Sequence, residues 1–414
     1  MWDKKEYEVP ESQFRDRLER VREFADVNNL SAVVAYSAPT IHHWAQSGHV
    51  GYLTNWSNLD RLADTMVVIP RTGEPVLLVA GVEYMLDQID EVSWMSDVRL
   101  VSSPDPRAVS SSYDAGVGGQ GATGGSRSFG GAVDAIIRAN GCSGSPIGIA
   151  GKDQLTFSLY KDLESSVKEG IADTVDIVAE LRSVKSAEEN SLQRQVAGIA
   201  DRCYETMIES LSDGMWGYEL SAEMDRSGKR VGADFIYSTM HTAPDGDLKA
   251  GVLSIKAHDH RLNQGDYVNA NPYIINKGYW IQSARSGTIG PTFPSSNAGL
   301  IQENLDIQLK VLDAIEPGLP IGELLKIAET GAERIGCTVQ GGRIGHGQGL
   351  DYSEMPFLRS GSTETLKPGH TFVLHVCLEI PGTNKLIRPI GNLCLVTEDG
   401  VEILDKFSSE LFHT

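Results

Sequence analysis

The feature that most limits the possible folds is a change along the chain in how helical and strand-like segments alternate. Residues 11–28 place apolar side chains three or four positions apart, which predicts an amphipathic helix. Short apolar runs typical of buried strands follow: LSAVVAYS, TMVVIP, EPVLLVAG, VRLVSS and PIGIAG. Helical and strand segments that alternate in this way predict an α/β unit in the first part of the chain.

The second part alternates differently, and a composition shift across residues 175–190 separates the two. Ser186 followed by Glu189 offers a capping box at the start of a long helix. Helices are expected at 186–211, 217–231, 296–315 and 321–335, with short strands between them. This arrangement predicts an α+β unit. The expected domains are therefore residues 1–175 and 176–414.

Charge and composition exclude several classes of partner. The chain has 36 basic and 56 acidic residues and a net charge of −20, which argues against binding to nucleic acid or to anionic membranes. No run of about 18 apolar residues occurs, and the charged start lacks the apolar segment of a signal peptide. Five cysteines without CxxC spacing suit a reducing compartment. We expect a cytoplasmic protein.

A Gly- and Ser-rich segment at residues 110–131 resembles a dinucleotide-binding loop only superficially, because no strand leads directly into it. We expect a surface loop or a lid there.

Five segments carry a resemblance to a known family. They are LRSVKSAEENSLQRQVAGIAD, NQGDYVNANPYIINKGYWIQSARSGTIG, IGHGQGLDYSEMPFL, KPGHTFVLHVCLEIPG and RPIGNLCLVTEDGVEIL. In this order and spacing they resemble the creatinase/aminopeptidase P family over nearly the whole chain. The resemblance implies an α/β N-terminal domain followed by a "pita-bread" α+β domain.

The resemblance also locates the positions at which metallopeptidases of the family bind two divalent ions. Their Asp, Asp, His, Glu and Glu ligands fall here on Asn271, Gln282, His346, His375 and Gly391. Divalent ions need anionic oxygens, which these positions do not supply. We therefore expect no metal and no other cofactor; a single zinc ion shared by His346 and His375, for which no third ligand is evident, is the alternative. Creatinase is the metal-free precedent, but its general-base His falls on Ser254 and a substrate-binding Glu on Ala284, so creatine is not the expected substrate.

Three residues are the catalytic candidates. His346 lies in GHGQG, where glycine lets the backbone approach a ligand closely; a structural role, with the ring bonded to the backbone, is the alternative. His375 is either catalytic or a core histidine. Glu354 matches the "E-x-P" position and would form an acid–base pair with the imidazoles, unless it is a surface acid.

Further candidates would bind the substrate. Asn271 and Gln282 would orient it, and His241 follows a strand where the family places substrate-lining residues. Glu379 shares the His375 face of its strand by the two-residue period. Arg61 lies near a creatinase Arg that reaches the neighbouring subunit's site, which implies a homodimer with composite sites; a surface ion pair of Arg61 is the alternative.

Together these residues predict a metal-independent hydrolase that cleaves a C–N bond (amide, amidine or ureido) in a small polar metabolite. A lyase on the same scaffold and a non-catalytic ligand-binding protein are the alternatives. The presence of His346 favours an enzyme, whereas the loss of the carboxylates favours a binding protein.

Overall fold

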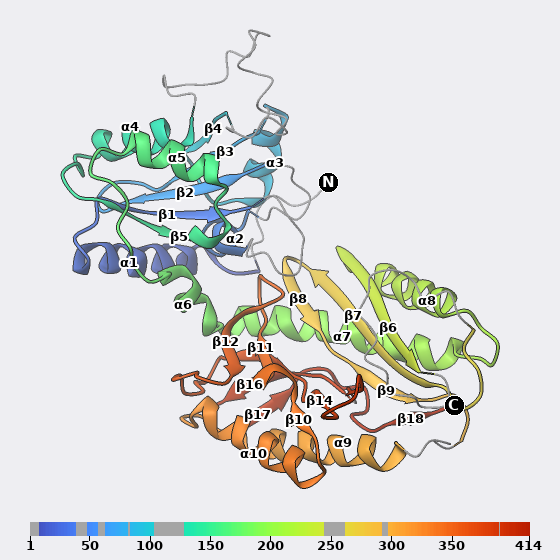
Figure 1. Ribbon diagram of the computed structural model, residues 1–414. Helices are drawn as coiled ribbons and strands as arrows, with labels where there is room; N and C mark the ends of the chain where they lie inside the picture. Colours follow the sequence, from blue (N-terminus) through green and yellow to red (C-terminus); the bar gives the residue numbers. More distant parts are fainter. Residues whose placement is uncertain are drawn as a thin grey trace. The chain divides into compact units, whose positions relative to one another are not determined.

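The computed structural model is shown in Figure 1, and it describes residues 8–38, 48–56, 63–81, 83–102, 128–243, 261–291, 297–388 and 390–414. The chain divides into two compact units, Met1–Arg182 and Ser183–Thr414, where the sequence analysis placed the boundary between residues 175 and 176. Among the described residues, no helix has the length and apolar character needed to cross a membrane.

The first unit is built on a mixed five-stranded sheet of order β4-β3-β2-β1-β5. Its inner pairs β1·β2 and β2·β3 are antiparallel, and β5 and β4 join in parallel. The strands are β1 (Ala32–Ser37), β2 (Thr65–Pro70), β3 (Val76–Val79), β4 (Val98–Leu100) and β5 (Ile147–Ala150). The predicted α/β character of this unit is confirmed.

Helices accompany this sheet: α1 (Glu11–Val27), α2 (Gly48–Thr54), α3 (Tyr84–Val92), α4 (Phe129–Ala139), α5 (Phe157–Ser166) and α6 (Ile177–Ser183). Helix α1 agrees with the predicted range, and its apolar positions Phe14, Leu18 and Val21 are buried. Side chains of α4 and α5 pack with those of the strands in one apolar core.

The second unit has four long helices at the predicted places. They are α7 (Ala187–Ser210), α8 (Gly217–Arg230), α9 (Ala298–Asp313) and α10 (Ile321–Arg334). The predicted capping box is present: the Ser186 hydroxyl accepts from Glu189 N, and the Glu189 carboxylate accepts from Ser186 N. This capping box fixes the residue at which α7 begins.

One sheet of the second unit has the order β18-β9-β7-β6, with β8 also paired to β7. The strands are β6 (Phe235–Ala243), β7 (Tyr267–Asn276), β8 (Tyr279–Gln282), β9 (Arg285–Thr288) and β18 (Phe412–His413). Helix α7 contacts β7 and β8, and α8 contacts β6 (Figure 1). Side chains from both helices form one core with Ile236, Val268 and Ile274.

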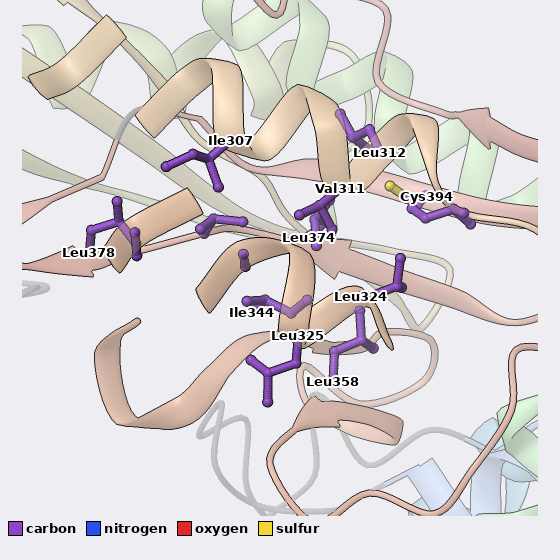
Figure 2. Close-up of a cluster of buried hydrophobic side chains, with 14 of the residues drawn as sticks. Ile307, Val311, Leu312, Leu324, Leu325, Ile344, Leu358, Leu374, Leu378 and Cys394 are labelled. Atoms are coloured by element: carbon purple, nitrogen blue, oxygen red, sulfur yellow. The ribbon is translucent and has the colours of Figure 1, made fainter. Parts of the chain in front are cut away.

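The other large sheet has the order β12-β11-β13-β16-β17. Its strands are β11 (Arg343–Gly347), β12 (Glu354–Arg359), β13 (Thr371–Leu374), β16 (Asn392–Thr397) and β17 (Gly400–Ile403), and a small sheet joins β10 (Thr338–Val339), β14 (Leu378–Glu379) and β15 (Leu386–Ile387). Figure 2 shows Ile307 and Val311 of α9 and Leu324 of α10 packed with strand residues such as Leu374. The segregated helices and antiparallel strands confirm the α+β prediction.

Candidate functional site

The strands β6 and β7 carry a polar face opposite the face that packs on α7 and α8. Residues that pair directly across antiparallel strands lie on the same face. The pairs Tyr237↔Tyr273, Thr239↔Asn271 and His241↔Asn269 therefore share one face, and the alternate residues, among them Met240 and Val268, enter the apolar core. Every residue of β7 is buried, so this polar face lies inside the unit.

Hydrogen bonds fix the amide side chains on this face. Asn271 Nδ2 donates to Asn269 Oδ1 at 2.8 Å, and Asn269 Nδ2 donates to the carbonyl oxygen of Arg388 at 2.9 Å and to Ser286 Oγ at 2.7 Å. Tyr267 OH donates to the same Ser286 Oγ at 3.0 Å. Asn271, predicted to orient a substrate, is thus held by neighbours whose own positions are fixed.

Gln282 lies on β8, which pairs with β7, and it is held by two residues of the segment that follows β11. Its backbone N–H donates to Gln348 Oε1 at 3.1 Å, and its Oε1 accepts from Tyr352 OH at 3.1 Å. Because Tyr273 pairs with Gln282 across the strands and its ring lies 5.5 Å from that of Tyr352, the amide sits among tyrosines.

His346 is at the centre of a cluster that also contains Tyr352, His375 and Gln282, which we call the histidine cluster. Its side chain is fully buried, and its ring centroid lies 4.9 Å from that of Tyr352 and 5.6 Å from that of His375. Glycine is required on both sides, because a Cβ at Gly345 or Gly347 would lie 2.2 Å from a carbonyl oxygen of an adjacent strand. The two glycines are explained by this close approach of strands, whereas the sequence analysis expected a close approach of the backbone to a ligand.

The protonation state of His346 follows from its burial. Burial lowers its pKa to about 4, so the imidazole is neutral at pH 7. Nδ1 lies 3.1 Å from the carbonyl oxygen of Gly347, which can only accept, so Nδ1 carries the proton. Nε2 is buried without a hydrogen-bond partner among the described residues. It therefore presents a lone pair inside the cluster.

His375 follows β13 directly, and its N–H donates to the carbonyl oxygen of Ile344 at 2.8 Å, which ties it to β11. Burial first, and then unfavourable electrostatic interactions with His346 and with the Arg343 charge, lower the pKa of His375 to about 3. Nδ1 lies 4.0 Å from Cys377 Sγ. The structure thus brings His346 and His375 together as two neutral imidazoles.

Glu354 is near this cluster but is held by a different partner. Its Oε1 lies 2.6 Å from Lys185 Nζ, with the two side chains 6% and 1% exposed, and its Oε2 accepts from Asp351 N at 3.3 Å. The Glu354 charge still reaches His346, where it opposes the lowering of the pKa. Glu354 is a buried ion-pair partner rather than a surface acid, and its catalytic role stays a prediction.

The remaining candidates are placed as follows. His241 is buried on β6 opposite Asn269, with its ring 6.4 Å from that of Tyr267, so it lies on the polar face. Glu379 is exposed on β14 and pairs with Thr338 in the small sheet, and the structure does not bring it to the histidines. Arg61 and most of residues 110–131 lie outside the described residues.

Sequence reasoning missed the tyrosines and two arginines of the cluster. Tyr267, Asn269, Asn271 and Tyr273 alternate along β7, so a polar stripe with a period of two was visible in YVNANPY. Arg343 and Arg388 also act electrostatically on His375. No sequence signal indicated them, because they belong to segments far apart in the chain.

With this geometry in place, solved structures show what the fold resembles. A Xaa-Pro dipeptidase from Bacillus anthracis matches with a TM-score of 0.76 and 20% identity, covering 97% of this chain and 100% of that one. The prolidase from Pyrococcus horikoshii matches with a TM-score of 0.74 and 20% identity over 96% and 100%. A variant of aminopeptidase P from Escherichia coli matches at 0.66 and 15% identity over 96% of each chain. The fold is the pita-bread fold of creatinase and aminopeptidase P, as predicted.

Sequence comparison then gives the family. The model of metallopeptidase family M24 matches residues 191–404, more than half of the chain. The chain belongs to metallopeptidase family M24. An uncharacterized peptidase of Staphylococcus aureus (strain USA300) is 27% identical over 259 residues, which are 62% of this chain and 72% of the relative.

These findings correct the function expected from the sequence. The prediction of a metal-independent hydrolase acting on a small polar metabolite is wrong, because the family is one of peptidases and the similar proteins are named peptidases. The coarser prediction, a hydrolase of carbon–nitrogen bonds, agrees with membership of a peptidase family, since a peptide bond is such a bond.

The metal ions that this family implies do not fit the side chains present. Asn271 and Gln282 supply amides in place of carboxylates, and Gln282 Oε1 already accepts from Tyr352 OH. Among the described residues, no group of three or more His, Cys, Asp or Glu side chains is arranged to hold a metal ion. Two imidazoles without anionic oxygens do not offset the charge of divalent ions.

Proposed function

We propose that this protein hydrolyses a peptide-type carbon–nitrogen bond in a short peptide, at the cluster formed by His346, His375, Asn271 and Gln282. Family membership supports the type of bond. The observation that carries the location is the buried Nε2 of His346, which has a lone pair and no partner among the described residues. An unsatisfied buried acceptor beside fixed amide groups favours a ligand that donates a hydrogen bond to it.

Each residue of the cluster has a role in the proposed reaction that follows from its chemistry. His346 Nε2 accepts a proton from a water molecule as that water attacks the amide carbonyl carbon, and the same imidazolium then donates the proton to the leaving nitrogen. The amides of Asn271 and Gln282 orient the substrate. His375, also neutral at pH 7, donates or accepts a hydrogen bond beside His346.

Some finer features belong to the same proposal. We include His241 as a substrate contact because it lies on the polar face, and Glu354 as a group that tunes His346 through its charge. Arg61 is retained as a substrate contact on the family resemblance alone, from the partner subunit of a homodimer. The five cysteines, free and mostly buried, support work in a reducing compartment such as the cytoplasm.

A peptide library tests the proposal. The purified protein is incubated with dipeptides and tripeptides, including Xaa-Pro sequences, and new amino groups are detected by mass spectrometry. We expect cleavage, and a rate lowered about 10²- to 10⁴-fold in His346→Gln, since a positioned acid–base group is typically worth this much. His413→Gln, which changes an exposed histidine, is the matched control and should keep full activity.

Two results would contradict the proposal. Binding of peptides without any turnover would show a binding protein rather than a hydrolase. Cleavage that His346→Gln leaves intact would remove His346 from the assigned role.

A further inference from the structure

Helix α9 carries two amide side chains inside the second unit. Asn304 and Gln308 lie one turn apart, and both side chains are fully buried. Their neighbours on the helix, among them Ile307 and Val311, belong to an apolar core (Figure 2). A buried amide costs free energy unless its donors and acceptors are paired. The hydrogen bonds of these two residues therefore indicate what they contribute.

The Gln308 amide bonds to the backbone on both sides of His375. Gln308 Oε1 accepts from Val376 N at 2.9 Å, and Gln308 Nε2 donates to the carbonyl oxygen of Leu374 at 3.4 Å. The same Nε2 donates to Asn392 Oδ1 at 3.3 Å. The bond from Val376 N has the usual length of an N–H···O hydrogen bond and is the strongest of the three. One side chain thus spans the residues before and after His375.

This bridge lies where the strand is interrupted. β13 ends at Leu374 and β14 begins at Leu378 in another sheet, so residues 375–377 belong to neither strand. The N–H of His375 donates to the carbonyl oxygen of Ile344 at 2.8 Å, and the next N–H along the chain donates to Gln308. Buried backbone groups require partners. Gln308 therefore supplies the acceptor that a neighbouring strand supplies elsewhere in the sheet.

The bond to Val376 N also constrains His375, because the two residues share one peptide group. The side chain of Val376 belongs to the apolar core that contains Ile307. The ring of His375 lies instead in the histidine cluster, with its centroid 5.6 Å from that of His346. Fixing the plane of the shared peptide group fixes the direction in which the His375 side chain leaves the backbone.

Asn304 supports the other side of the site in a related way. Its Nδ2 donates to the carbonyl oxygen of Ile387 at 3.2 Å. The carbonyl oxygen of the next residue, Arg388, accepts from Asn269 Nδ2 at 2.9 Å, and Asn269 Oδ1 accepts from Asn271 Nδ2 at 2.8 Å. One helix therefore holds both the segment that carries His375 and the segment on which the amides of β7 depend.

We propose that Gln308 is a positioning residue of the histidine cluster, which holds the imidazole of His375 beside His346 by bridging Leu374 and Val376. Gln308 acts through His375 and does not contact a ligand. The inference rests on the proposed function only for the use made of His375 in hydrolysis, since the placement of the ring does not depend on any reaction. A misplacement of about 1 Å in a catalytic site can cost about 10²-fold in rate.

Nuclear magnetic resonance tests the proposal without any need for turnover. Gln308→Met keeps the length of the side chain and removes its hydrogen-bonding groups. Exchange of the Val376 N–H with solvent should become about two- to tenfold faster, the range that loss of one hydrogen bond predicts. In protein deuterated except at histidine, the nuclear Overhauser effect between the rings of His346 and His375 should weaken severalfold, because it falls steeply with distance.

A second buried glutamine of the same unit provides the matched control. Gln193 on α7 is fully buried, and neither atom of its amide has a hydrogen-bond partner among the described residues. Gln193→Met should leave both signals unchanged. Gln308→Glu keeps an acceptor for Val376 N, so it should preserve slow exchange and the Overhauser effect, and it tests the proposal even where Gln308→Met does not fold. Circular dichroism checks the fold of each variant.

Three outcomes would overturn the proposal. The first is an unchanged Overhauser effect in Gln308→Met although the Val376 N–H exchanges faster. The second is an equal weakening in Gln193→Met, which would indicate general damage to the core. The third is loss of the effect in Gln308→Glu while the Val376 N–H stays protected, because the bond would then be present without placing His375.

Kinetics connect this inference to the proposed hydrolysis. For a peptide that the protein cleaves, Gln308→Met should lower kcat about tenfold or more with KM nearly unchanged, since positioning of a catalytic group is lost and binding is not. A raised KM with unchanged kcat would contradict the assigned role of Gln308. If no peptide is cleaved while the resonance results are as expected, the hydrolysis alone is refuted and the positioning of His375 by Gln308 stands.

Discussion

Removing Lys185 should destabilise the second unit strongly, because it would leave the buried Glu354 carboxylate without its counter-ion. The two charged atoms lie 2.6 Å apart, and the side chains of Lys185 and Glu354 are 1% and 6% exposed. Breaking one partner of such a pair costs about 3–5 kcal/mol, since desolvation of the remaining charge is no longer offset. Lys185→Met keeps the length of the side chain and removes only the charge.

An exposed pair of the same chemistry provides the control. Lys326 and Glu323 lie 2.7 Å apart on α10 with 68% and 51% exposure, and a pair of this kind contributes about 0–1 kcal/mol. Lys326→Met should therefore change the free energy of unfolding by less than about 1 kcal/mol. The difference between the two Lys→Met variants isolates the effect of burial.

Urea unfolding followed by circular dichroism measures both variants. The double variant Lys185→Met/Glu354→Gln should recover part of the loss, because a neutral amide replaces the unpaired charge. A loss in Lys185→Met no greater than that in Lys326→Met would refute the reasoning. So would a double variant less stable than the sum of its single changes predicts.

Three further predictions concern other parts of the chain. Burial and nearby lysine charges lower the pKa of His370 to about 3, so the unfolded state binds more protons than the folded state below pH 6.5. The free energy of unfolding therefore falls as the pH drops from 6.5 towards 3, by about 1.4 kcal/mol per pH unit. In urea unfolding, the free energy of unfolding of His370→Gln should differ less between pH 7 and pH 5 than that of the wild type. Gly345→Ala should destabilise the protein, because its Cβ would lie 2.2 Å from a carbonyl oxygen. Gly299→Ala in α9, where a Cβ would meet no atom within 4 Å, should stabilise the protein by about 0.5–1 kcal/mol. Thermal melts compare the two variants. If Arg61 completes the site of a partner subunit, then mixing Arg61→Ala with His346→Ala subunits should restore activity, and no recovery despite subunit exchange would show that sites are not shared.

The helices of the second unit were the elements that the sequence predicted most accurately, because the signals for them are local in the chain. The capping residues Ser186 and Glu189 mark the start of α7, and apolar positions repeat at helical spacing through α9 and α10. Such signals lie within a few residues of one another, so they can be read without knowing the fold. The observed ends of these four helices differ from the predicted ends by two residues or fewer.

The site was predicted less completely because its contacts join distant segments. Order and spacing of the five motifs indicated that Asn271, Gln282 and His346 would be found at the family's ligand positions, and the structure places them in one cluster. The pairing of Glu354 with Lys185 could not be read from the chain, since no periodicity relates them. For Glu379, the two-residue period was a misleading guide, because the strand is interrupted: β13 ends at Leu374 and β14 begins at Leu378 in another sheet.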